Sequence, residues 1–129
     1  MRDDDGRHVI VYNGEIYNFL ELKSSLEKSH GPIEWHSSSD TEVILRGFAL
    51  EGPTFLRRLN GIFSMVILDR RTQELYTLRD PLGVKPLFVA ETSNGVVFGS
   101  EIKGLLRMPG VDARLRRMSV AEQLAFMYV

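Results

Sequence analysis

The apolar and polar positions of this chain follow two periods, and the shorter period predicts strands. Residues 7–12 are β-prone and mostly apolar, which predicts a strand, and Asn13-Gly14 should end it because both residues tolerate positive φ. Ile62–Leu68 is an almost uninterrupted apolar run, as expected for a strand that is buried on both faces. Three more strands are predicted, with Asn94-Gly95 as the hairpin signal between the last two: Glu74–Arg79, Leu87–Ala90 and Val96–Phe98.

Apolar residues at helical spacing predict two main helices. The first runs from Phe19 to about Ser29, with Asn18 as its N-cap, and Gly31-Pro32 stops it. The second opens at Ser39 and Glu42, which have capping-box spacing, and its apolar face carries Val43, Ile44, Gly47 and Phe48. Smaller elements complete the prediction: a short strand at Ile33–Trp35, a short helix at Thr54–Leu59, a helix with Ile102, Leu105 and Leu106 capped by Ser100-Glu101, and a last helix capped by Ser119.

The short connections between the predicted strands indicate antiparallel neighbours, and a doubly buried strand needs cover on each side. The pattern therefore predicts an α+β fold with a layered core. At 129 residues the chain is about one domain, and a hydrophobic fraction of 43% with a charged fraction of 26% is typical of globular proteins.

Composition and charge exclude several classes of function. No apolar run approaches the roughly 20 residues that cross a bilayer, and the acidic start Met1–Asp5 is no signal peptide, so we expect a cytoplasmic protein without a membrane partner. A formal charge of -1 argues against a nucleic-acid partner. There is no cysteine, and His8, His30 and His36 lack metal-ligand spacing, so no metal site is expected.

Asp5-Gly6 is a hairpin signal that has strand-like sequence on one side only. We interpret it as a turn whose first strand is missing, which would leave the edge of the following strand uncovered. An uncovered edge favours self-association, including a homodimer.

Four segments, in order, resemble the glutamine amidotransferase domain of glutamine-hydrolysing asparagine synthetases, a class II family with an N-terminal nucleophile. They are Asn-Gly-Glu-Ile-Tyr-Asn at 13–18, Ser39–Val43, Arg79–Leu87 and Gly99–Lys103. The resemblance covers roughly residues 7 to 107 and implies an Ntn-hydrolase-like αββα four-layer sandwich of antiparallel sheets, here without its first strands. It also divides the chain into the C-terminal portion of an amidotransferase domain at 1–107 and a linker and helix at 108–129 that lead toward a synthetase domain.

The resemblance also implies roles for individual residues. In the family an N-terminal cysteine attacks the side-chain amide of glutamine, and ammonia passes to a synthetase domain that uses ATP and Mg to amidate aspartate. Asn13 and Gly14 match the catalytic donors to the oxyanion and contact the substrate. Glu15 and Asp40 match further glutamine-binding positions, with Asp40 placed to pair with the α-ammonium group. Because this chain has no nucleophile, we expect it to be inactive by itself, and without a phosphate-binding glycine loop it should bind no ATP.

Other interpretations stay open beside these. His36, Ser39 and Asp40 contain the residue types of a hydrolytic triad, but triads are assembled from separated segments, so capping is favoured. The segment at 79–87 is interpreted as a loop between two strands, with Arg79-Asp80 as an internal ion pair. The function itself has two alternatives: a non-catalytic binding module that kept the fold, or a class II amidotransferase with a different acceptor.

Overall fold

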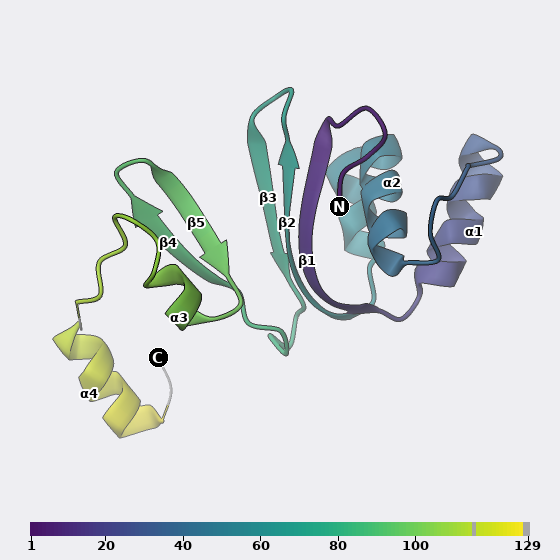
Figure 1. Ribbon diagram of the computed structural model, residues 1–129. Coiled ribbons are helices and arrows are strands. Elements are labelled where there is room, and N and C mark those ends of the chain that lie inside the picture. Colours follow the sequence, from purple (N-terminus) through teal and green to yellow (C-terminus); the bar gives the residue numbers. More distant parts are fainter. Residues whose placement is uncertain (115, 128–129) are drawn as a thin grey trace. The chain divides into compact units, whose positions relative to one another are not determined.

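A computed structural model describes residues 1–114 and 116–127 of the chain, which form two compact units, Met1–Leu87 and Phe88–Val129. Each unit is built on its own antiparallel sheet (Figure 1). The mixed α+β architecture with antiparallel sheets is therefore as predicted. In the described part of the chain, no helix is long and apolar enough to cross a membrane.

The sheet of the first unit has three strands in the order β1-β2-β3: β1 (His8–Ile16), β2 (Gly61–Asp69) and β3 (Glu74–Arg79). The apolar run at 62–68 forms the central strand, as expected. Its helix-facing residues Phe63, Met65 and Ile67 are buried, whereas on the opposite face Ser64 is buried and Ile62, Val66 and Leu68 are half-buried. The prediction of burial on both faces thus holds fully for one face only.

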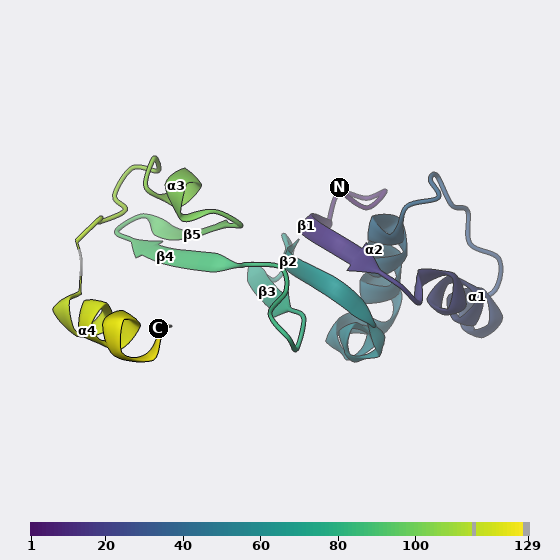
Figure 2. The ribbon, with the colours of Figure 1, turned by 90° about the horizontal axis from the view of Figure 1, so that it is seen from below.

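Helices cover a single face of this sheet, and both views show α1 and α2 on the same side of it (Figures 1 and 2). They are α1 (Phe19–His30), α2 (Asp40–Glu51) and the 3-10 helix η1 (Gly52–Arg58), which replaces the helix predicted at Thr54–Leu59. Burying apolar area between helices and sheet is the main favourable term in folding. The shared core contains Ile10, Ile16, Leu22, Leu26, Val43, Ile44, Leu45, Phe48, Phe55, Leu56, Phe63, Met65 and Ile67.

Strand β1 does not end at Asn13-Gly14, which corrects the prediction. Gly14 lies opposite Phe63, and the one-to-one register continues to Ile16 opposite Gly61. Pairing with β2 outweighs the local turn preference, because each added pair supplies hydrogen bonds and cross-strand contacts.

Two predicted helix caps also differ from what the structure contains. Asn18 precedes α1 but makes no side-chain cap; its amide accepts from the Asn60 N–H and donates to the Arg58 carbonyl, both at 3.0 Å. Ser39 does cap α2, accepting from the Thr41 N–H at 3.1 Å, but Glu42 does not close a capping box. Asn18 and Glu42 instead bond segments outside the helix ends, which the local pattern does not reveal.

The strand predicted at residues 33–35 is wrong, and the interpretation of the turn at Asp5-Gly6 needs an addition. Residues 33–35 form no strand; the Trp35 indole N–H donates to Glu27 at 2.7 Å, which holds this segment against α1. The turn at Asp5-Gly6 does have a second arm, because Arg2 pairs with Val9 and the Ile10 N–H donates to the Met1 carbonyl at 3.0 Å. The arm is short, so β1 is covered on its outer edge only at its start.

In its described residues, the second unit contains a hairpin and two helices: β4 (Phe88–Thr92), β5 (Gly95–Gly99), α3 (Ile102–Leu105) and α4 (Arg117–Phe126). The hairpin turn lies at Asn94 as predicted. Glu101 stands at the N-cap of α3 without a side-chain cap bond, and Ser119 lies inside α4 rather than at its start. Leu124 is 79% exposed, so the apolar residues of α4 lack cover, and the predicted division at 107/108 stays a prediction.

Candidate functional site

The first residue of α2 binds the outer edge of β1. Asp40 Oδ2 accepts a hydrogen bond from the Tyr12 hydroxyl at 2.6 Å and another from the Ile16 N–H at 3.0 Å. These two donors lie on either side of the segment 13–15. The structure therefore brings the carboxylate of Asp40 next to the segment that carries the other predicted site residues.

The main-chain N–H of Gly14 points toward this same outer edge. Along β1 the N–H groups of Ile10 and Ile16 are directed away from β2, one to Met1 and the other to Asp40. Gly14 lies an even number of residues from both, so its N–H points to the same side of the strand. Its partner Phe63 uses its own N–H and carbonyl to bond Asp80 on the β3 side. Because direction alternates along an antiparallel strand, the Gly14 N–H and the Asp40 carboxylate share one edge.

Asn13 and Glu15 alternate with Gly14 along the strand, so their side chains lie on the face of the sheet opposite α1 and α2. Both are exposed, and the cross-strand neighbour of Asn13 is the buried Ser64. The predicted residues thus form two groups, with Gly14 and Asp40 at the strand edge and Asn13 and Glu15 beside them on the sheet face.

Tyr12 is a site residue that the sequence reasoning missed. Burial, and to a smaller extent the hydrogen bond to Asp40, raises the pKa of the Tyr12 phenol above its usual range. The hydroxyl therefore stays protonated at neutral pH and acts as a donor. In the sequence Tyr12 is one more β-prone residue of the strand, and only its contact 28 positions away distinguishes it.

The loop at 80–87 is held by two neighbouring side chains that bind main-chain groups. Asp80 is buried, and its carboxylate accepts from the N–H groups of Phe63, Leu82, Val84 and Lys85 at 3.0–3.3 Å. Arg79 donates to the carbonyls of Gly83 and Lys85. The segment is a loop that follows β3, as predicted, but each partner of the expected ion pair binds the main chain instead.

The segment before Asp40 is organised by a buried carboxylate and assembles no triad. The ring of His36 lies 3.3 Å from Asp4, whereas the His36 N–H donates to Glu42 at 2.9 Å. Ser37 donates to Glu42 through both its N–H and its hydroxyl at 2.7 Å. Burial raises the pKa of Glu42, but these hydrogen bonds lower it by more, so the pKa lies below its ordinary value. Glu42 therefore fixes the loop that leads into the helix start carrying Asp40.

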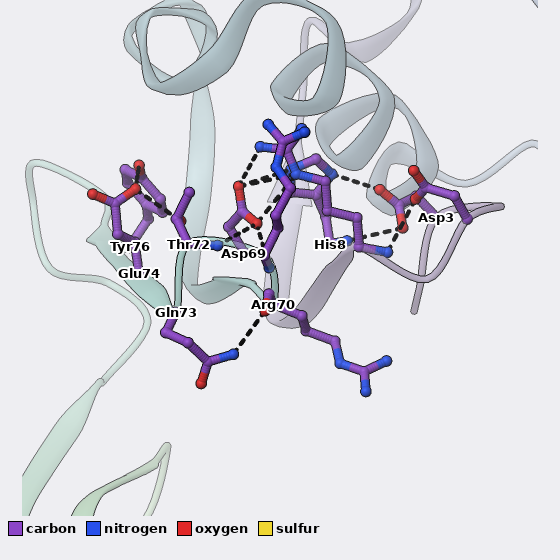
Figure 3. Close-up of polar contacts among 11 residues, drawn as sticks. Asp3, His8, Asp69, Arg70, Thr72, Gln73, Glu74 and Tyr76 are labelled. Atoms are coloured by element: carbon purple, nitrogen blue, oxygen red, sulfur yellow. Dashed lines mark hydrogen bonds and ion pairs between the residues drawn. The ribbon is translucent and has the colours of Figure 1, made fainter.

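A second polar cluster lies at the other end of β1, where Figure 3 shows His8 between Asp3 and Asp69. His8 lies in a strand, as the pattern at residues 7–12 predicts, and it is buried. Asp69 also binds the Arg7 guanidinium, with Nε at 3.1 and 3.2 Å from its two oxygens. The hydrogen bonds from Arg7, assisted by the N–H groups of Arg71 and Thr72, hold the pKa of Asp69 far below its ordinary value.

This cluster should make the stability of the first unit depend on pH. Since the pKa of Asp69 is lower in the folded than in the unfolded state, its contribution is complete above the ordinary aspartate pKa of about 4 and is lost as the pH falls below that value. We expect the urea midpoint to decline below pH 4 and Asp69→Asn to lower the midpoint at pH 7 while flattening this decline. Glu34→Gln, which removes an exposed carboxylate from the same unit, is the control; an equally steep decline in Asp69→Asn contradicts the assignment.

A cavity of about 140 Å³ lies in the first unit, away from the predicted residues. None of Asn13, Gly14, Glu15 or Asp40 lines it. Its walls are formed by Met1, Arg2, Asp3, Asp4, His36, Ser37, Glu42, Leu45 and Arg46. Because His36, Ser37 and Glu42 line it, we regard the cavity as part of the structure that supports this loop.

The sequence of this chain is similar to those of known proteins. The putative asparagine synthetase [glutamine-hydrolyzing] of Mycobacterium tuberculosis strain H37Rv is 39% identical over 126 residues, which are 95% of this chain and 19% of that protein. Asparagine synthetase [glutamine-hydrolyzing] 3 of Bacillus subtilis strain 168 is 37% identical over 116 residues, which are 89% of this chain and 18% of that protein. The chain thus spans about a fifth of the length of these relatives.

A solved structure shares the fold. It is glutamine phosphoribosylpyrophosphate amidotransferase from B. subtilis in complex with ADP and GMP, with a TM-score of 0.65 at 24% identity over 81% of this chain and 24% of that chain. The family model described as glutamine amidotransferase domain matches residues 1–129. The chain therefore belongs to the glutamine amidotransferase domain family, as a class II domain related to asparagine synthetases.

Proposed function

We propose that this chain is the glutamine-binding portion of the glutaminase domain of an asparagine-synthetase-type amidotransferase. The observation that carries the proposal is that the Gly14 N–H and the Asp40 carboxylate face the same edge of β1. A donor and an anion at one strand edge suit a ligand that carries both a carbonyl to polarise and an ammonium group to bind.

Glutamine fits this pair of groups at its two ends. Asp40 binds the α-ammonium group, and a charge-assisted hydrogen bond of this kind contributes about 1.5–3 kcal/mol. At the other end the Gly14 N–H and the side-chain amide of Asn13 donate to the oxygen that becomes negative when the side-chain carbonyl is attacked. One such donor is worth about 3–4 kcal/mol in the transition state. Glu15, exposed beside Asn13, binds the substrate from the sheet face.

Turnover needs a thiolate that this chain does not contain, since its sequence has no cysteine. In the longer protein the family's N-terminal cysteine supplies the nucleophile. Ammonia then passes to a synthetase domain that uses ATP and Mg to amidate aspartate. We place this activity in the cytoplasm, which supplies free glutamine and ATP.

We also propose that the complete domain is an αββα four-layer sandwich. The face of the β1-β2-β3 sheet opposite α1 and α2 supports it, because that face carries exposed apolar side chains, among them Val11, which is 71% exposed, and Leu75, which is 47% exposed. A second sheet packed there would bury these residues at about 25 cal/mol per Å². Self-association through the outer edge of β1 also stays a prediction, which size-exclusion chromatography at several concentrations tests.

Binding of glutamine to the 129-residue chain tests the proposal directly. In NMR titrations with millimolar glutamine we expect saturable shifts at the Gly14 and Ile16 amides. Asp40→Asn should weaken binding tenfold or more, as about 1.5–3 kcal/mol predicts. The matched control Asp112→Asn removes an exposed carboxylate from the second unit and should bind as the wild type does.

Two results would contradict the proposal: no saturable shift in the wild type, or equal affinity in Asp40→Asn. Glutaminase turnover by this cysteine-free chain would overturn the roles assigned above. The two alternative functions, a non-catalytic binding module and a class II amidotransferase with a different acceptor, keep the same fold, so another observation must distinguish them. An in-frame Met-Cys-Gly start in the upstream gene sequence favours the enzyme, whereas a stop codon there favours a binding module, and the acceptor domain distinguishes the amidotransferases.

A further inference from the structure

We infer that Tyr12 is a positioning residue for this site: its hydroxyl holds the Asp40 carboxylate at the edge of β1, in the orientation that receives the α-ammonium group of the ligand. The inference rests on the proposed function and adds a residue that does not itself touch the ligand.

The hydrogen bonds of Asp40 are divided unequally between its two oxygens. Oδ2 accepts from the Tyr12 hydroxyl at 2.6 Å and from the Ile16 N–H at 3.0 Å. Oδ1 accepts from the hydroxyls of Ser39 and Thr41, at the long distances of 3.5 and 3.4 Å. Because both of these hydrogen bonds are longer than an ordinary O–H···O bond and therefore weak, Oδ1 keeps the capacity to bind a cation.

Without Tyr12 the carboxylate has a competing position. Asp40 is the first residue of α2, and a carboxylate in the first turn of a helix is attracted to the N–H groups of that turn. Ser39 already satisfies the Thr41 N–H, but the first N–H groups of a helix have no partner within the helix, so we expect the others to attract a rotated Asp40 side chain. The hydroxyl of Tyr12, on another element, opposes this rotation.

Tyr12 is suited to this task because its own position is fixed. Its side chain packs against the core of the first unit on the helix-facing side of β1. A tyrosine has only two side-chain torsions, so a packed ring places its hydroxyl accurately. The raised pKa of the phenol keeps the donor proton in place throughout the neutral range.

The experiment compares two ligands in Tyr12→Phe. One is glutamine and the other is 4-carbamoylbutanoate, which has the same amide and carboxylate but no α-ammonium group. We expect Tyr12→Phe to weaken glutamine binding about five- to tenfold, the effect of roughly one hydrogen bond, and to change binding of 4-carbamoylbutanoate less than about twofold. Tyr76→Phe is the matched control, because its hydroxyl donates to Glu74 at 2.8 Å on the same sheet.

The outcomes separate the inference from the proposed function. If Asp40→Asn weakens glutamine binding but Tyr12→Phe does not, or if Tyr12→Phe weakens both ligands equally, the positioning role is wrong and the glutamine site stands. If the wild type binds no glutamine, the proposed function fails, and the ligand-directed role of Tyr12 fails with it.

A double-mutant cycle tests the contact without a ligand. Urea unfolding of Tyr12→Phe, Asp40→Ala and the double variant gives the coupling between the two side chains. We expect a coupling of about fivefold in the folding equilibrium constant. A coupling below about twofold would overturn the inference whatever the binding data give.

Discussion

Gly14→Ala should remove most of the stability of the first unit, with an expected loss of about 4 kcal/mol in the free energy of unfolding. Gly14 has a φ of 155°, which L side chains rarely adopt, and an added Cβ would lie 2.2 Å from the Ile62 carbonyl oxygen and 2.6 Å from Phe63 Cα. Both atoms belong to the main chain of the central strand, so relief requires β1 and β2 to separate. Urea unfolding followed by circular dichroism measures the loss.

Gly31→Ala separates backbone strain from the clash. Gly31 also has a positive φ, of 84°, but no atom lies within 4 Å of the position of its Cβ. Its replacement should cost only about 1 kcal/mol. A Gly14→Ala variant no less stable than Gly31→Ala would contradict the close approach of β1 to β2. Glutamine binding should weaken with the first change only, since the Gly14 N–H loses its position.

Gly47→Ala has the second largest expected effect, and two terms of opposite sign decide it. Alanine is favoured over glycine inside a helix by about 1 kcal/mol. Against this, the added Cβ would lie 2.2, 2.3 and 2.5 Å from ring atoms of Phe55, which is fully buried. Overpacking of this severity costs about 3 kcal/mol, so we expect a net loss of about 2 kcal/mol in urea unfolding.

A compensating change identifies the cause. Phe55→Leu removes the ring atoms that Gly47→Ala meets, so the double variant should be more stable than the sum of the single losses. Gly104→Ala, at a helical glycine of α3 with no atom within 4 Å, should be neutral or stabilising. Additive losses in the double variant would show that α2 and η1 do not meet at this contact.

Local pattern predicted the elements whose signal lies within a few residues. The apolar run at 62–68 became the central strand, and Gly31 and Gly52 ended α1 and α2 as their permissive φ allows. Boundaries failed where distant partners act. Asn13-Gly14 favours a turn locally, but β2 supplies a pairing partner for β1 from about 50 residues further along the chain. Asn18 and Glu42 likewise bind segments other than the helix ends that their spacing suggests.

For the candidate site, too, the sequence determined one part and the tertiary structure another. The sequence by itself determined the family, because four ordered segments carry its residue types, and it named Asn13, Gly14, Glu15 and Asp40 as the residues to examine. Only the tertiary structure decided that Gly14 and Asp40 share one strand edge, that Asn13 and Glu15 lie on the sheet face beside it, and that Tyr12 binds Asp40. The physical reason is that residue types follow from the chain itself, whereas the direction of a strand N–H and the partner of a carboxylate depend on hydrogen bonds between segments far apart in sequence.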